Sequence, residues 1–249
     1  MAGTRSKSSG RSAGRGRFLR RAAAGLVVAL ALFTAWQALT WPDVAALVST
    51  NPRDTAFIEA YRSRQRAVGK PDGVAFRFVP YARIADDLKR AVLVGEDIGF
   101  FDHEGFEIAE LKKALAEARE ELELPRGAST ITQQLAKNLW LSPSRNPWRK
   151  AKEAALTWQL ERTLSKRRIL ELYLNVVEFG PGIYGAEAAA QRYFGKGAAS
   201  LTAHEAAQLA AGLPRPSTWH PGSASRGYAR RVAVIERRME QARHLAKLI

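Results

Sequence analysis

Two glutamates and the polar, basic stretch between them are the residues of this sequence best suited to chemistry. The first, Glu96, lies in the motif GEDIGFFDHEGFE, where aromatic residues and glycines surround a Glu–Asp pair. A carboxylate in partly apolar surroundings has a raised pKa, which makes it a usable acid or base near neutral pH. The alternative for Glu96 taken alone is an ordinary surface carboxylate at the end of a helix.

The second carboxylate, Glu153, lies in the segment NPWRKAKEAALTWQLERTLS. On a helix it shares the inward face of Leu156 and Leu160. A glutamate on such a face is seldom unpaired. The spacing leaves two interpretations open, namely a carboxylate of a functional site and a structural ion pair with a neighbouring helix or with Arg149 or Lys150.

The stretch RGASTITQQLAKN, residues 126–138, is poorly suited to an apolar core. On a helix that begins near Thr130, Gln133, Gln134 and Lys137 are spaced by three and four residues and form a donor-rich face. Amides bind hydroxyl and N-acetyl groups, and Lys and Arg bind phosphates. This face therefore suits a ligand that is part sugar and part diphosphate, and a solvated basic face is the alternative. The cations that follow along the chain are Arg145, Arg149 and Lys152.

Helices are expected to position these residues. Apolar side chains recur at helical spacing over about 84–95, 108–122, 156–164, 169–176 and 228–239. Ser165 is a typical helix N-cap, and Thr202 with Glu205 has the pattern of a capping box. The segment 73–81 alternates and indicates a short strand. We therefore predict one mainly α domain over residues 42–249.

The front of the chain differs from this domain. Seven Lys and Arg residues and no acidic residue fall within residues 1–21, which predicts a disordered, basic cytoplasmic tail. Residues 22–41 carry no charged side chain and have the length of about 20 residues that a single transmembrane helix needs. A cleaved signal peptide is the alternative. The arginines before this segment predict that the N-terminus is cytoplasmic and that the domain lies outside.

Composition narrows the function classes only partly. The formal net charge of +15 suits nucleic acid, anionic lipid or a phosphorylated ligand. The sequence has no cysteine, which excludes disulfides and thiolate metal sites. The 46% of hydrophobic residues suffice for a sizeable core.

A resemblance to a known family extends these interpretations. The segments EDIGFFDHEGFE, RGASTITQQLAKN, RKAKEAALTWQLE, KRRILELYLNVVEFGPGIYGAEAAAQRYFGK and LAAGLPRPS occur in this order. Together they resemble glycosyltransferase family 51, the peptidoglycan glycosyltransferases, over roughly residues 80–240. The resemblance implies a lysozyme-like, mainly α fold and lipid II as the substrate. Because the sequence stops at Ile249, we expect a monofunctional member without the penicillin-binding transpeptidase domain.

The resemblance also implies roles for individual residues. Glu96 matches the general base, and Glu153 matches the second essential carboxylate, which would stabilise the leaving group or hold its metal. The residues expected to bind the donor and its diphosphate are Ser129, Gln133, Gln134, Lys137, Arg145, Arg149 and Lys152. A later motif is expected to be mostly shape-forming, through Asn175, Glu178, Phe179, Gly180, Tyr184 and Gly185. The sequence departs from common family residues at Glu107, Arg126 and Ala128, and none of these changes removes a chemically required group.

The implied reaction is inverting β-1,4 glycosyl transfer from a polyprenyl-diphosphate-linked glycan to the 4-hydroxyl of lipid II. Cations would stabilise the departing diphosphate, with a divalent ion, Mg²⁺ or Mn²⁺, held partly by Glu153. We expect no organic cofactor. A lysozyme-like lytic transglycosylase or hydrolase is the first rival, although it would need a general acid. A membrane-anchored basic scaffold is the second.

The expected partners and location follow from this reaction. The partners are lipid II, the growing lipid-linked glycan, the membrane, and cell-wall synthesis or division proteins, with no nucleic acid. The expected location is the cell inner membrane, with one span, a cytoplasmic N-terminus and a periplasmic catalytic domain.

Overall fold

The computed structural model describes residues 10–106, 129–143 and 146–249. The chain divides into two units, Met1–Asp43 and Val44–Ile249. The first unit contains one long helix, α1 (Gly10–Leu39). This helix extends into the segment 1–21, for which the sequence predicts disorder. Residues 1–9 lie outside the described part of the chain. Among the described residues, no helix combines the length and the apolar character needed to cross a membrane.

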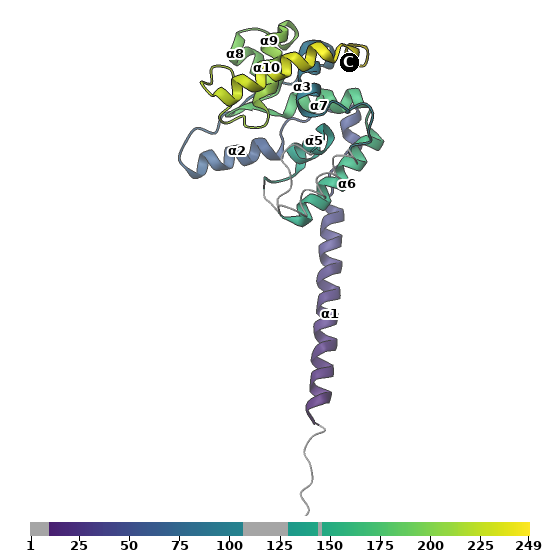
Figure 1. The fold of residues 1–249 in the computed structure, drawn as a ribbon. Coiled ribbons are helices and arrows are strands. Elements are labelled where there is room, and N and C mark those ends of the chain that lie inside the picture. The colour runs from purple at the N-terminus through teal and green to yellow at the C-terminus, as the bar shows by residue number, and fades with distance from the viewer. Residues whose placement is uncertain (1–9, 107–128, 144–145) are drawn as a thin grey trace, which may run out of the picture. The chain divides into compact units, whose positions relative to one another are not determined.

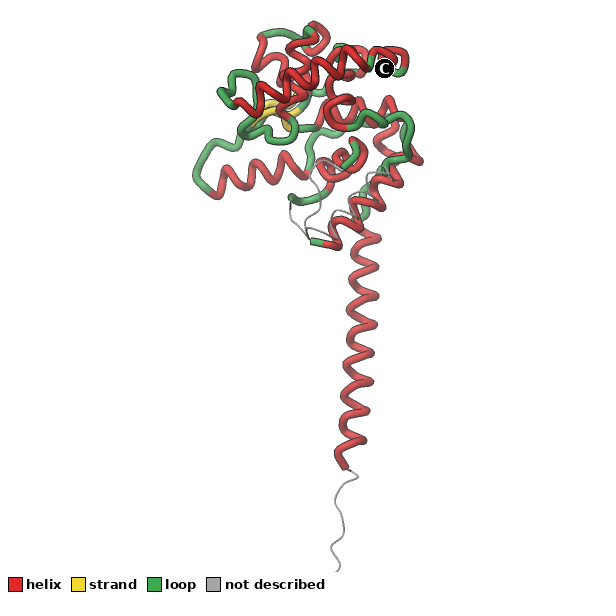
Figure 2. The backbone as a smooth tube through the Cα atoms, viewed as in Figure 1, coloured by secondary structure: helices red, strands yellow, loops and turns green. Residues whose placement is uncertain are grey.

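The second unit is mainly helical, as predicted (Figures 1 and 2). Its α-helices are α2 (Ala56–Ala67), α3 (Asp86–Glu96), α5 (Ile131–Trp140), α6 (Pro147–Thr163), α7 (Lys166–Val176), α8 (Ala186–Phe194), α9 (Ala203–Gly212) and α10 (Arg226–Gln241). Short 3₁₀ helices span Ala45–Val48, Tyr81–Arg83, Ala198–Ser200 and Arg243–Lys247. The helix expected over residues 108–122 lies outside the described residues.

The helix starts follow local sequence signals. Thr130 caps α5 and forms a capping box with Gln133, and Thr202 with Glu205 does the same for α9, as predicted. Ser165 caps α7 by accepting a hydrogen bond from the backbone N–H of Arg168. Each cap satisfies backbone donors that the first helical turn leaves without a partner.

One small sheet accompanies these helices. Its strands are β1 (Ala75–Phe76), β2 (Glu178–Gly180) and β3 (Ile183–Tyr184), in the order β1-β3-β2. β1 runs parallel to β3, and β2 runs antiparallel to it. The strand expected over 73–81 is thus only two residues long, because its partner β3 offers two residues before Gly185 starts α8.

Two helix packings build the core and meet at the site. α5 packs against α2, α6 and α7, whereas α3 packs against α9 and α10. The predicted stripe of α10 is buried. The two packings are joined where α3 ends and α5 begins, which brings the C-terminal turn of one helix beside the N-terminal turn of the other. The apolar side chains buried on α10 are Tyr228, Val232, Ile235 and Met239.

Candidate active site

Glu96 is the last residue of α3, and its side chain is 11% exposed. One oxygen, Oε2, accepts a hydrogen bond from Gln134 Nε2 at 3.0 Å. The other, Oε1, accepts one from Arg231 Nη2 at 3.0 Å. Burial raises the pKa of Glu96, and hydrogen bonds from Gln134 and Arg231 together with the charge of Lys137 oppose that rise. The carboxylate is therefore oriented, nearly buried and more basic than a free glutamate.

Gln134 is itself held in one orientation. Tyr173 Oη donates to Gln134 Oε1 at 3.0 Å, and Gln134 Nε2 also donates to the carbonyl of Ser129 at 3.3 Å. Burial raises the pKa of Tyr173 well above its ordinary value, so the phenol stays a donor. With its oxygen engaged by a donor, the amide must present its NH₂ group to Glu96.

Asp97 joins the end of α3 to the start of α5. Its Oδ2 accepts from the backbone N–H of Ile131 at 2.9 Å. Its Oδ1 lies 2.9 Å from Nε2 of His103, whose Nδ1 accepts from the N–H of Gly105 at 3.0 Å. The hydrogen of this imidazole therefore resides on Nε2 and points at Asp97. Thr130 Oγ1 closes the arrangement by donating to the carbonyl of Gly105 at 2.7 Å.

Lys137 lies one turn beyond Gln134 on α5 and is partly buried. Burial lowers the pKa of Lys137, the charges of Glu153 and Glu96 raise it, and those of the cations on α6 lower it. Its Nζ also lies 5.8 Å from the ring centroid of Phe57 on α2. Lys137 thus interacts electrostatically with both predicted catalytic carboxylates, although they lie on different helices.

Glu153 is buried on α6, as its spacing predicts, with 3% of its side chain exposed. Arg149 Nη1 donates to its Oε2 at 2.8 Å, and Lys150 Nζ donates to its Oε1. The local ion pair that the spacing left open is therefore present. Glu153 thereby holds Arg149 and Lys150, both of which interact electrostatically with Lys137.

These contacts bear on the expected divalent ion. Both oxygens of Glu153 face cationic donors, and no three His, Cys, Asp or Glu side chains of the described residues are grouped to hold a metal. Mg²⁺ commonly takes one or two protein carboxylates and relies on substrate phosphates for the rest. The residues around Glu153 fit direct binding of an anion by cations better than a metal held by the protein.

The remaining predicted residues are placed as follows. Gln133 is buried and uses its amide oxygen in the capping box of α5. It therefore does not belong to the open, donor-rich face on which the sequence placed it. Ser129 precedes the cap, and Lys152 is partly buried on α6. Arg145 lies outside the described residues. The substrate-binding roles of all of these residues stay predictions.

Three contributors were missed from the sequence. In the sequence, Asp97 stands out only as the neighbour of Glu96, and Tyr173 only as part of the apolar stripe of α7. Arg231 was not singled out, yet it directly precedes Val232 on the buried stripe of α10. A cation next to an apolar stripe is a signal in the sequence, but Arg238 before Met239 shares it, so it does not single out Arg231.

The later motif mostly shapes the fold, in line with the expectation. Asn175 is fully buried, and it exchanges hydrogen bonds with the backbone of Val79 at 2.8 and 3.0 Å. Gly185 has φ +84°, and a Cβ there would lie 2.4 Å from the carbonyl oxygen of Asn175. Only glycine fits both requirements.

A nearly buried carboxylate within electrostatic reach of a cation suits an enzyme that deprotonates an acceptor while an anionic group departs. A family model described as Transglycosylase matches residues 63–240, and the chain belongs to that family. Similar proteins carry the name biosynthetic peptidoglycan transglycosylase. That of Thiobacillus denitrificans is 46% identical over 215 residues, covering 86% of this chain and 93% of its own. That of Methylobacillus flagellatus is 43% identical, covering 88% and 95%. That of an Azoarcus species is 49% identical, covering 80% and 85%.

Proposed function

We propose that this protein polymerises lipid II into peptidoglycan glycan strands by inverting β-1,4 glycosyl transfer. The observation that carries the proposal is the placement of Glu96 between two donors, within the electrostatic reach of Lys137, which in turn interacts with Glu153. The names of the similar proteins support the same substrate class.

In the proposed reaction, Glu96 accepts the proton of the acceptor's 4-hydroxyl. The freed oxygen bonds to the anomeric carbon of the donor sugar, and the bond from that carbon to the diphosphate oxygen breaks. The electron pair leaves with the diphosphate, near Lys137 and the cations of α6. Preorganised charge at the place where charge develops is commonly the largest catalytic contribution.

The same geometry favours transfer over hydrolysis. A glycoside hydrolase needs a carboxylic acid to protonate a poor leaving group. Both oxygens of Glu153 instead face the cations Arg149 and Lys150. These cations suit a diphosphate that leaves without protonation.

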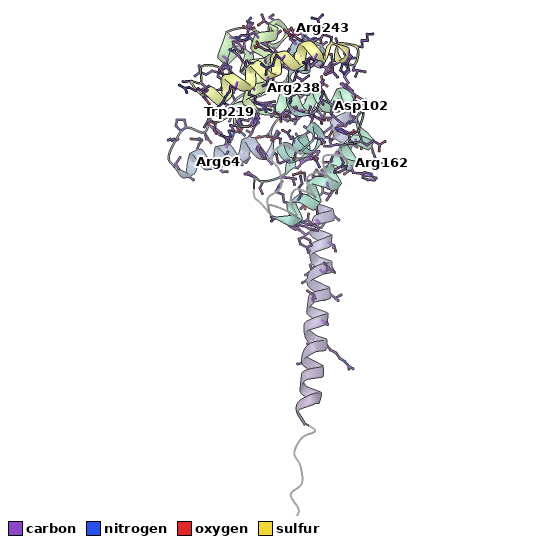
Figure 3. The ribbon with its side chains drawn as sticks, in the orientation of Figure 1. Arg64, Asp102, Arg162, Trp219, Arg238 and Arg243 are labelled. Atoms are coloured by element: carbon purple, nitrogen blue, oxygen red, sulfur yellow. The ribbon has the colours of Figure 1, made fainter. Side chains whose placement is uncertain are left out.

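A groove with a volume of about 840 Å³, lined by none of the predicted catalytic residues, is a further place where a sugar could bind. It lies between α2, the β2–β3 turn and residues 214–218, and Arg64, labelled in Figure 3, lies on its α2 side. Phe57, which contacts Lys137, lies on the same helix α2. Polar and aromatic lining of this kind fits sugar residues. The lining includes Tyr61, Arg64, Glu178 and Arg215.

The test is lengthening of glycan from purified lipid II. We expect Glu96→Gln to lower the rate by about 10²–10⁴-fold, because it removes the base. Glu104→Gln is the matched control, since Glu104 belongs to the same motif but is exposed. The proposal fails if Glu96→Gln polymerises at the wild-type rate, or if the wild-type protein releases fragments from purified sacculi and leaves lipid II unchanged.

The expected divalent ion is part of this proposal as a counter-ion of the diphosphate. Added Mg²⁺ or Mn²⁺ should raise the rate relative to a chelated reaction, and the ion should bind lipid II and protein together more tightly than protein alone. An equal rate in excess chelator would contradict a role for the ion.

We also place the protein at the cell inner membrane, with residues 22–41 as the attachment and the Val44–Ile249 unit in the periplasm. A lipid-linked substrate stays in the bilayer, so tethering raises the local concentration of enzyme and substrate. The apolar side chains of α1 support attachment, since Leu26 is 71% and Leu32 67% exposed. We expect the full chain to remain with membranes after alkaline extraction, and Leu30→Arg to weaken that retention. Complete extraction of the wild-type chain would refute the attachment.

A further inference from the structure

Two arginines of α10 cap the C-terminal end of α3. Arg238, labelled in Figure 3, donates from Nη1 to the carbonyl of Val94 at 3.2 Å. Arg231 donates from Nη2 to the carbonyl of Gly95 at 3.0 Å. The last carbonyls of a helix lack partners within the helix, and cations there also complement its dipole. Both arginines therefore share one structural task.

Arg231 has a second contact that Arg238 lacks. Its Nη2 also lies 3.0 Å from Oε1 of Glu96, so the guanidinium bridges the backbone and the side chain of consecutive residues. Gln134 on α5 holds the other carboxylate oxygen. Glu96 is thus gripped from two helices, one donor to each oxygen.

A further observation separates Arg231 from an ordinary cap. Its Nε is buried and has no hydrogen-bond partner among the described residues. The guanidinium thus uses Nη2 for both the carbonyl of Gly95 and the carboxylate of Glu96, while its Nε has no described partner.

We propose that Arg231 is a positioning residue for the base, which keeps the Glu96 carboxylate ionised and aimed toward the acceptor. This inference rests on the proposed function, because it takes Glu96 as the base. It assigns part of the active site to the last α-helix of the domain. The substrate need not touch Arg231 for this role.

The surroundings of Glu96 set the direction of the effect. Gln134 and Lys137 face it from α5, and Arg231 faces it from α10. Tyr173 on α7 interacts electrostatically with Glu96 and with Asp97. Burial raises the pKa of Glu96, whereas Arg231 lowers it by charge and hydrogen bond. Removing the guanidinium therefore moves the ionisation of Glu96 to higher pH.

The experiment compares the pH dependence of kcat for three variants in the lipid II assay. Arg231→Gln should shift the acid limb upward by about one pH unit or more, since a nearby opposite charge commonly lowers a carboxyl pKa by 1–3 units. Arg231→Lys should bring the acid limb most of the way back to its wild-type pH, because it keeps the charge. It should not restore the full kcat, because it loses the bridging geometry. Arg238→Gln, the matched control, should lower the melting temperature without shifting the limb.

A second measurement needs no substrate. The ¹³C signal of the Glu96 carboxyl, assigned by its loss in Glu96→Gln, should titrate at higher pH in Arg231→Gln than in the wild type. An unchanged titration, or an equal shift in Arg238→Gln, would overturn the inference. If the wild type fails to polymerise lipid II while the carboxyl signal shifts as expected, the proposed function fails and the electrostatic pairing of Arg231 with Glu96 stands.

Discussion

Asp97→Asn is predicted to destabilise the domain, although it only replaces one carboxylate oxygen with an NH₂ group of similar size. Asp97 is an acceptor at both oxygens, from the N–H of Ile131 and from Nε2 of His103. His103 cannot reverse its role, because its Nδ1 accepts the N–H of Gly105. An asparagine has one acceptor and one NH₂ group, so one of these donors must face another donor.

The size of the effect follows from burial. The side chain of Asp97 is 1% exposed and that of His103 is 9% exposed, so water cannot replace the lost partner. A buried donor left without a partner costs about 1–3 kcal/mol. In a domain of 150–250 residues, each kcal/mol lowers the melting temperature by about 2–4 °C. We therefore expect Asp97→Asn to melt about 2–12 °C below the wild type.

Activity should fall as well, because Asp97 connects the helix ends that carry Glu96 and Gln134. We expect kcat to fall about tenfold or more with a smaller change in KM, since small misplacements of catalytic groups are costly. The control is Asp102→Asn, an exposed carboxylate of the same motif (Figure 3). Its stability should stay within about 0.5 kcal/mol of the wild type.

A double-mutant cycle isolates the cause. His103→Phe keeps a ring against Phe100, whose centroid lies 6.3 Å from that of His103, but it removes the facing donor. In the Asp97→Asn background, His103→Phe should lower the free energy of unfolding by less than it does in the wild type, with a coupling energy of about 0.5–3 kcal/mol. Additive costs, or an Asp97→Asn variant that melts with the wild type, would refute the hydrogen-bond assignment.

Two further predictions concern the donors around the base. Burial lowers the pKa of Lys137, so the lysine loses its charge at lower pH than a free lysine does. The Lys137→Arg variant should therefore retain a larger share of its neutral-pH rate at alkaline pH than the wild type. An unchanged alkaline limb of the rate profile would contradict this. Tyr173→Phe frees the amide of Gln134 and should shift the acid limb of kcat upward, whereas Tyr228→Phe, which removes a 3.0 Å hydrogen bond to the carbonyl of Gln208, should affect stability alone.

Local signals predicted much of the fold. The caps at Thr130 and Thr202 and the buried stripe of α10 needed only residues within one helix or turn of each other. The buried position of Glu153 followed from the same periodicity. Helix α1 extends into residues 10–21, where the charge and low hydrophobicity of the sequence favour disorder.

The site could be predicted only in part, for a reason of distance along the chain. Glu96 and Arg231 are separated by 135 residues, and Tyr173 and Gln134 by 39. No periodic pattern indicates such pairs, since each partner satisfies the rules of its own helix. The sequence motif predicts Glu96 as the base, and only the packing of α10 against α3 shows that Arg231 lies against it.

We expect an order in the proposed reaction, because Lys137 lies within electrostatic reach of Glu96. Lys137 is one of the groups that lower the pKa of Glu96, and burial lowers the pKa of Lys137 in turn. A diphosphate bound at Lys137 would stabilise the charge of the lysine and offset its field at Glu96. The base would then strengthen once the donor is in place, when an acceptor hydroxyl has a sugar to attack. Arg231 meets Glu96 on its other oxygen, and it keeps the carboxylate ionised while that change occurs.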